Sequence, residues 1–144
     1  MESIGVLIVD DHTLFRRGVR QMIELEDDMR VLGEASTGRE AVDKARDLMP
    51  DLILMDIQMP DPEAGPGQAL DGIGAARILH REMPHVGIVF CTMYEDDEFV
   101  FAVLKAGGRG YILKESDPDT MLRAIRAVAS GESLLSPTIA QKVL

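Results

Sequence analysis

Five polar side chains stand at the ends of short apolar runs in this chain: Asp10, Asp11, Asp56, Thr92 and Lys114. Carboxylates gathered in one place repel one another, which raises their pKa values or requires a cation between them. Mg²⁺ suits such a cluster because it takes oxygen ligands and keeps several waters. The threonine hydroxyl and the lysine ammonium add a hydrogen-bond donor and a positive charge. These groups are what phosphoryl transfer to an aspartate requires, and we predict that Asp56 is the acceptor.

The five side chains would meet if the apolar runs before them were neighbouring strands. Residues 4–9, 30–35, 52–55, 86–92 and 110–113 are predicted to form short strands, and the apolar runs among them are typical of strands buried on both faces. The carboxyl ends of parallel strands share one edge of a doubly wound sheet, where open α/β folds bind their ligands. The polar side chains should therefore lie together on that edge.

Amphipathic stretches between these runs predict helices. Thr37-Gly-Arg-Glu40 has the spacing of a capping box, Asp96-Asp97 suits a helix start, and Asp117 precedes a proline at the favoured first position. A further helix is predicted at roughly 71–82. The first helix is predicted to turn Leu14, Phe15, Gly18, Val19, Met22 and Ile23 inward and Arg16, Arg17 and Arg20 outward. This alternation predicts an α/β fold, with a doubly wound five-stranded parallel sheet and helices on both faces.

Length and composition fit a single soluble domain. The 144 residues are enough to bury a core, and no apolar run approaches the roughly 20 residues of a membrane-spanning helix. A formal net charge of −10 opposes contact with nucleic-acid backbones, so this segment is not expected to hold DNA by itself. The single cysteine, Cys91, and an N-terminus unlike a signal peptide favour a cytoplasmic location.

At these polar positions the chain resembles the receiver domain of two-component response regulators. The matching runs are Leu7-Ile-Val-Asp-Asp-His12, Asp56-Ile-Gln-Met-Pro60, Asp71-Gly-Ile73, Thr92 and Gly110-Tyr-Ile-Leu-Lys114. They cover nearly all of residues 1–131, and segments 106–111 and 124–128 look most like NarL/FixJ-type transcriptional regulators. The resemblance implies a flavodoxin-like fold with strand order 2-1-3-4-5. It also implies a receiver domain at 1–131 and the start of a linker helix at 132–144.

The resemblance implies a role for each acidic residue. Asp56 would take a phosphoryl group from the phosphohistidine of a sensor histidine kinase. Asp11 and Asp56 would ligate Mg²⁺ directly, together with the backbone carbonyl of Gln58. Asp10 would act on the ion through a water molecule.

The remaining implied roles concern the switch and its partners. Thr92 and Lys114 would bind phosphoryl oxygens, and Tyr111 would be an aromatic switch whose rotamer follows Thr92. The chain would not be an enzyme beyond catalysing its own phosphorylation and dephosphorylation. Phosphorylation would favour a homodimer, formed through either the first and fifth helices or the fourth-helix side. DNA would be bound only through a helix-turn-helix output domain beyond Leu144.

Some positions depart from the family pattern. Residues 61–70 separate Pro60 from Asp71 by more than the usual spacing, and their Pro and Gly content predicts an irregular loop. This loop is either a tolerated surface insertion, or a segment that covers the site or meets a partner. Met93 is larger than the residue that many receivers carry there, which would restrict access of water or small phosphodonors. His12 is expected to be structural or solvated and not a metal ligand.

Two rival functions on the same fold fit less well. A flavin- or nucleotide-binding enzyme would need a Gly- or Ser/Thr-rich phosphate loop after the first strand, where this chain has Asp10-Asp11-His12. A phosphatase with an aspartyl-phosphate intermediate would carry a second acid two residues after the nucleophile, where this chain has Gln58. A stand-alone receiver that docks on another protein is the alternative to a transcriptional regulator.

Overall fold

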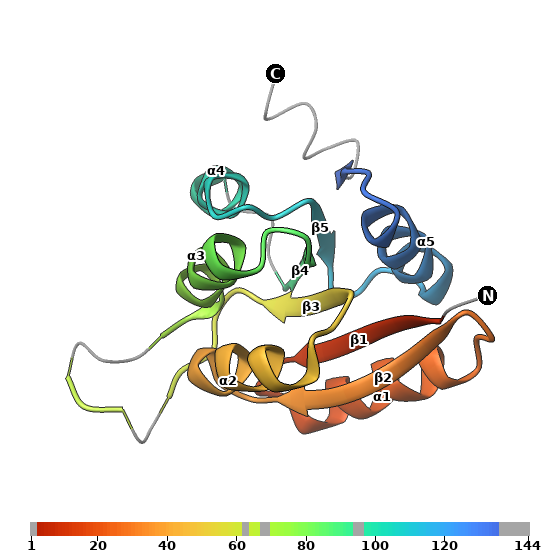
Figure 1. Ribbon diagram of the computed structural model, residues 1–144, viewed down its shortest axis with the longest axis horizontal. Helices are drawn as coiled ribbons and strands as arrows, with labels where there is room; N and C mark the ends of the chain where they lie inside the picture. Colours follow the sequence, from red (N-terminus) through yellow and green to blue (C-terminus); the bar gives the residue numbers. More distant parts are fainter. Residues whose placement is uncertain (1–2, 62–63, 67–69, 94–96, 136–144) are drawn as a thin grey trace.

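A parallel β-sheet forms the centre of the computed structural model, which describes residues 3–61, 64–66, 70–93 and 97–135 (Figure 1). Its strands are β1 (Ile4–Val9), β2 (Met29–Ala35), β3 (Leu52–Asp56), β4 (Gly87–Thr92), β5 (Gly110–Leu113) and β6 (Leu134–Leu135). They pair in the order β2-β1-β3-β4-β5-β6, and each pair is parallel. The predicted order 2-1-3-4-5 is confirmed, and β6 adds a short strand that was not predicted.

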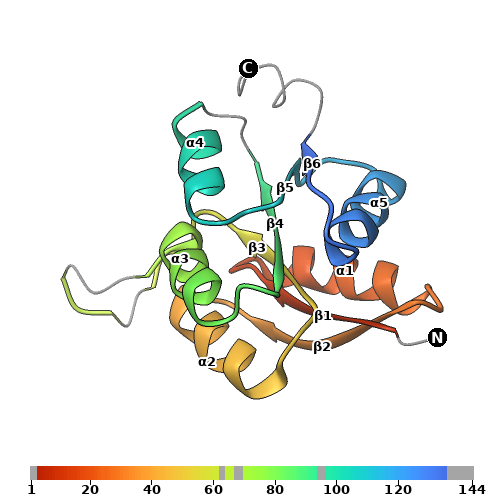
Figure 2. The same ribbon diagram turned by 45° about the horizontal axis from the view of Figure 1, so that its top comes forward.

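The described helices cover both faces of this sheet. They are α1 (Thr13–Glu24), α2 (Gly38–Leu48), α3 (Gly72–Glu82), α4 (Asp97–Lys105) and α5 (Pro118–Ala129). Helices α1 and α5 pack on one face, and α2, α3 and α4 pack on the other (Figure 2). Alternate residues of β1 enter different cores: Val6 and Ile8 face α1 and α5, while Leu7 and Val9 face the other layer. The central strands are therefore buried on both sides, as their apolar runs predict.

Side-chain caps begin three of the helices. Thr37 accepts a hydrogen bond from the backbone N–H of Glu40 (3.1 Å) at α2, which confirms the predicted cap. Asp117 does the same for Thr120 (2.8 Å) at α5, where Pro118 is the first helical residue. Helix α3 is capped by Asp71, whose carboxylate accepts from the N–H of Gly74 (2.7 Å). Helix α1 lacks such a bond at its N-cap, His12.

The prediction for the first turn of α1 is wrong. Leu14, expected to face inward, is 83 % exposed, whereas Val19 and Ile23 are buried. At about 100° per residue, Leu14 lies about 180° around the helix from Ile23, so the two cannot face the same core. Phe15 is partly buried against that core instead.

The last segment is described only at its beginning. Leu134 donates its backbone N–H to the carbonyl of Arg109 (2.8 Å), which ties β6 to the edge of the sheet beside β5. Of the segment 132–144, predicted to start a linker helix, residues 134 and 135 form strand β6 instead, and residues 136–144 lie outside the described residues, as does part of the loop 61–70. Among the described helices, none has the length and apolar character needed to cross a membrane.

Candidate functional site

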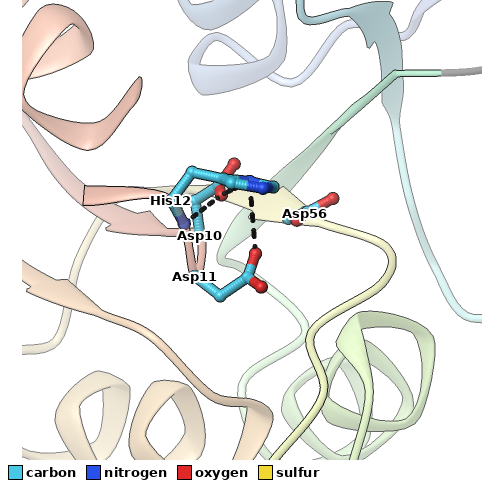
Figure 3. Close-up of side chains that lie close together, drawn as sticks. All are labelled: Asp10, Asp11, His12 and Asp56. Atoms are coloured by element: carbon cyan, nitrogen blue, oxygen red, sulfur yellow. Dashed lines mark hydrogen bonds and ion pairs between the residues drawn. The ribbon is translucent and has the colours of Figure 1, made fainter. Parts of the chain in front are cut away.

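The register of the sheet places the predicted acidic residues side by side at the carboxyl edge of neighbouring strands. Val9 of β1 pairs with Met55 of β3, so the residues that follow them, Asp10 and Asp56, end neighbouring strands at the same edge. Asp11 comes next in the chain, and an oxygen of each of these three carboxylates lies within 4.8 Å of the others. The predicted gathering of carboxylates at the carboxyl edge is thus present (Figure 3).

Two carboxylate oxygens of this cluster lack ordinary hydrogen bonds. Asp10 is 1 % exposed, and its Oδ2 makes no well-aligned hydrogen bond and has only an ion pair with Lys114. Asp11 Oδ1 is also buried and makes no hydrogen bond; its near neighbour is the ring of His12. Buried carboxylate oxygens of this kind are costly unless a cation or donor reaches them. These residues fit a hard divalent ion such as Mg²⁺.

Lys114 supplies the positive charge that the cluster needs in this state. Its Nζ lies 2.7 Å from Asp10 Oδ2 and 3.2 Å from Asp56 Oδ2, and its side chain is only 5 % exposed. The ammonium also lies 5.0 Å from the centre of the Phe15 ring, within reach of a cation–π contact. Burial by itself would lower the pKa of Lys114, but the two carboxylates outweigh that effect and raise the pKa. Lys114 is therefore a charged ammonium.

Burial and the neighbouring carboxylates together raise the pKa of Asp56 by more than this one ammonium lowers it. Burial is the largest cause that raises the pKa of Asp56, to about 6, and the charge of Asp10 adds to the effect. Lys114 acts in the opposite direction but does not restore the usual value of 3.8. A second positive charge at this position would favour the ionised carboxylate, which is the nucleophilic form.

Thr92 is on β4, the strand next to Asp56, and Tyr111 is on β5, one strand further along the sheet. Thr92 ends β4, is 5 % exposed, and its carbonyl accepts the backbone N–H of Lys114 (2.8 Å). This bond fixes the lysine beside the threonine at the predicted edge. Tyr111 is 1 % exposed and belongs to the core between the sheet and α2, α3 and α4. A link between the Tyr111 rotamer and Thr92 stays a prediction.

An open hollow beside the cluster gives the site an approach from solvent. It measures about 590 Å³ and is lined by His12, Phe15, Gln58, Met93, Lys114 and Glu115. Met93 is 59 % exposed at its rim, which agrees with its predicted place near the acceptor. Gln58 is exposed, and the role of its carbonyl as a metal ligand stays a prediction.

Sequence reasoning missed two residues that touch this cluster. Arg16, assigned to the outer face of α1, donates from Nη1 to the carbonyl of Asp10 and from Nε to Glu34 (3.1 Å). It is 16 % exposed and holds the turn that carries the first two carboxylates. His12 turns its ring back over that turn. The acidic Glu34 in the short strand β2 could have indicated that Arg16 faces the sheet, because a partly buried acid in a strand needs a cationic partner.

Residues 6–126 match the family model described as response regulator receiver domain. The relatives include the response regulator GacA of Pseudomonas viridiflava, 40 % identical over 97 % of this chain and 62 % of the relative. The transcriptional regulatory protein LiaR of Bacillus subtilis is also 40 % identical, over 98 % of this chain and 63 % of the relative. This chain therefore spans about three fifths of the length of these curated relatives.

The fold has close counterparts among solved structures. A two-component response regulator of the LuxR family from Aurantimonas sp. SI85-9A1 superposes with a TM-score of 0.86 at 32 % identity, covering 99 % of this chain and 96 % of that one. The signal receiver domain of the putative response regulator NarL from Mycobacterium tuberculosis gives a TM-score of 0.82 at 27 % identity, over 92 % and 100 % of the two chains.

Proposed function

Because this chain belongs to the response regulator receiver domain family, we propose that it is a signalling switch in which Asp56 accepts a phosphoryl group. One observation carries the assignment: Lys114 Nζ lies between the oxygens of Asp10 and Asp56, at 2.7 and 3.2 Å, on an edge that also holds Asp11. A carboxylate acceptor, a mobile cation and a pair of acids that can hold a metal are the parts that such a transfer requires.

In this proposal the donor is the phosphohistidine of a sensor histidine kinase. A carboxylate oxygen of Asp56 attacks phosphorus, a phosphorus–oxygen bond forms, and the phosphorus–nitrogen bond to the donor imidazole breaks. Lys114 is already within 3.2 Å of the acceptor oxygen and follows the new negative charge. Thr92, at the end of the adjacent strand, donates its hydroxyl to another phosphoryl oxygen. Tyr111 responds to Thr92, which links the site to the core beneath α4.

Mg²⁺ is the proposed cofactor of this transfer. Asp11 and Asp56 would hold the ion directly with the carbonyl of Gln58, and Asp10 would hold it through a water molecule. The buried oxygens Asp10 Oδ2, which has only the ion pair with Lys114, and Asp11 Oδ1, which makes no hydrogen bond, support this assignment. When bound, the ion neutralises the carboxylates and the charge that develops on the phosphoryl group.

The proposed output is transcriptional control. Relatives of this chain are named transcriptional regulatory proteins, among them DegU of Brevibacillus brevis at 34 % identity. We infer that phosphorylation favours a homodimer and that a helix-turn-helix output domain, not this acidic segment, contacts DNA. The chain would work in the cytoplasm and would catalyse only its own phosphorylation and dephosphorylation.

The test is to label the protein with a small phosphodonor and Mg²⁺, and to map the adduct. We expect a hydroxylamine-sensitive acyl phosphate on Asp56 in the unaltered chain and none in Asp56→Asn. Asp47→Asn, which removes an exposed carboxylate of α2, should label normally. An adduct that persists in Asp56→Asn, or that maps to another residue, would refute the assignment of the acceptor.

A further inference from the structure

The ring of His12 is turned into the acidic cluster and not toward solvent alone. Its Nδ1 lies 3.1 Å from Asp10 Oδ1 and 3.3 Å from Asp11 Oδ1, as the dashed lines of Figure 3 mark. The rest of the side chain is well exposed, at 63 %, so only one edge of the ring faces inward. Of the residues that the structure describes, His12 is the one nitrogen ligand that joins this carboxylate group.

The local backbone holds the ring in this position. His12 is the N-cap of α1 in an extended conformation (φ −89°, ψ 106°), and its N–H donates to Asp10 Oδ1 (2.9 Å). Arg16, one turn further along α1, binds the carbonyl of the same aspartate. Both His12 and Arg16 thus bind Asp10, one through its side chain and one through its carbonyl. The ring of His12 therefore lies over the carboxylate that the His12 N–H also binds.

The distances from His12 Nδ1 to the two carboxylate oxygens match the spacing of ligands around one metal ion. Bonds of about 2.1 Å give ligand-to-ligand edges of about 3.0 Å at right angles and about 3.4 Å at tetrahedral angles. The observed distances of 3.1 and 3.3 Å fall in this range. Asp11 Oδ1 is buried and makes no hydrogen bond, which independently marks a place for a cation.

Lys114 binds the carboxylates of this cluster through oxygens other than Asp10 Oδ1 and Asp11 Oδ1. Its Nζ binds the other oxygen of Asp10, Oδ2, and Oδ2 of Asp56. The ammonium also lies 3.2 Å from His12 Nδ1. An ion at Nδ1 takes the place of that last contact, while the lysine keeps both carboxylate oxygens as partners.

We propose that His12 Nδ1, Asp10 Oδ1 and Asp11 Oδ1 form a binding site for a divalent transition-metal ion. The proposal rests on the proposed function in using the same acids, but it needs no phosphoryl transfer. Mg²⁺ prefers oxygen ligands alone, whereas Mn²⁺, Co²⁺, Ni²⁺ and Zn²⁺ accept imidazole nitrogen beside carboxylates. His12 therefore distinguishes the two classes of ion: it strengthens transition-metal binding and contributes little to Mg²⁺ binding.

The test is a Co²⁺ titration of the full chain, followed by the visible d–d absorbance and by calorimetry, with a parallel Mg²⁺ titration. His12→Ala should weaken Co²⁺ binding by about 10- to 100-fold, the range for loss of one group at a metal site. Its Mg²⁺ affinity should change by less than about twofold. His85→Ala, which removes an exposed histidine before β4, is the matched control and should change neither.

Two outcomes would overturn the proposal. If His12→Ala binds Co²⁺ as tightly as the unaltered chain, the His12 imidazole is not a ligand of the ion. Equal losses of Co²⁺ and Mg²⁺ affinity would show that the ring acts by positioning the acids. Repeating the titration in Asp56→Asn separates this question from phosphorylation, because that variant lacks the acceptor but keeps all three proposed ligands. The His12 dependence should persist there even if Asp56 proves not to be the acceptor.

Discussion

Asp56 is a buried carboxylate whose charge opposes folding in the absence of a metal ion. Its pKa rises from 3.8 in the unfolded chain to about 6 in the folded one. The folded protein therefore binds the proton more tightly, so this group's contribution to stability is fully present below pH 3.8. That contribution is lost as the pH rises through about 6. Above that pH the protein is thus less stable because of the carboxylate that we propose as the phosphoryl acceptor.

Asp56→Asn should accordingly stabilise the metal-free protein at neutral pH. Removing the uncompensated charge should raise the free energy of unfolding by about 1–3 kcal/mol at pH 7.5, since one pKa unit corresponds to about 1.4 kcal/mol. The gain should shrink toward pH 4.5, where Asp56 of the folded protein is already neutral. Urea denaturation in EDTA at both pH values measures the effect, with Asp47→Asn as control. Equal stability at pH 7.5 would contradict the raised pKa.

Which single residues could be foreseen depended on what defines their position. Topology alone brings together the side chains at the ends of strands: Asp10 and Lys114 follow β1 and β5, and Asp56 is the last residue of β3. Arg16 and His12 reach the carboxylate cluster because of their side-chain rotamers and the rotation of α1 about its own axis. Both depend on how α1 packs against the sheet. The spacing of apolar residues carries no such information. That is why the sequence assigns both residues to roles away from the site.

At the scale of elements, the first residue of α3 packs directly against the end of β3. A Cβ on Gly72 would lie 1.9 Å from the carbonyl oxygen of Asp56, much closer than any side chain can approach. The backbone N–H of Gly72 donates to the carbonyl of Ile57 (3.0 Å). The helix and the residue after the acceptor therefore touch backbone to backbone. This contact fixes where the end of β3 stands.

Gly72→Ala should therefore destabilise the protein and displace Asp56. We expect a loss of about 2–3 kcal/mol in the free energy of unfolding, as for other forced overpacking of a core. Gly18→Ala is the matched control, because nothing lies within 4 Å of its added Cβ in the middle of α1. It should gain about 0.5–1 kcal/mol from helix propensity. Urea denaturation compares the two, and an unchanged Gly72→Ala would show that the loop relaxes freely.

Elements with their own local signals were predicted well. The caps Thr37 and Asp117 and the short apolar strands are encoded by neighbouring residues, and they occur where expected. Strand β6 has only two residues and forms because Leu134 meets Arg109 and Gly110 across the sheet. A pairing that short leaves no periodic pattern in the sequence. The prediction that Leu14 faces inward is wrong for a different reason. An apolar residue type does not by itself show toward which side of the helix the side chain points.

At the scale of the whole molecule, metal binding and folding should be linked. The acids Asp10, Asp11 and Asp56 come together only in the folded sheet, so an ion bound by them stabilises the native state. At ten times its dissociation constant, Mg²⁺ should add about 1.4 kcal/mol to the free energy of unfolding. For a domain of this size the melting temperature should then rise by about 3–6 °C.

Thermal unfolding in EDTA, in Mg²⁺ and in sodium chloride of matched ionic strength measures this linkage. Asp11→Ala should lose most of the Mg²⁺-dependent rise, and sodium chloride should produce little of it in either protein. A rise of the same size in Asp11→Ala would remove this aspartate from the metal site. That result would not bear on the proposed role of Asp56 as acceptor, which the phosphodonor labelling tests separately.

The two edges of the sheet differ, and this bears on how the protein behaves at high concentration. At one edge the short strand β6 pairs with Gly110 and Tyr111 of β5, so only two residues form the edge strand there. In the described residues β2 is the edge strand on the other side. A break in its register opposite Val6 and Leu7, with the exposed Arg30 nearby, makes β2 a poor template for intermolecular strand addition. We therefore expect both edges of this sheet to be poor starting points for aggregation by strand addition.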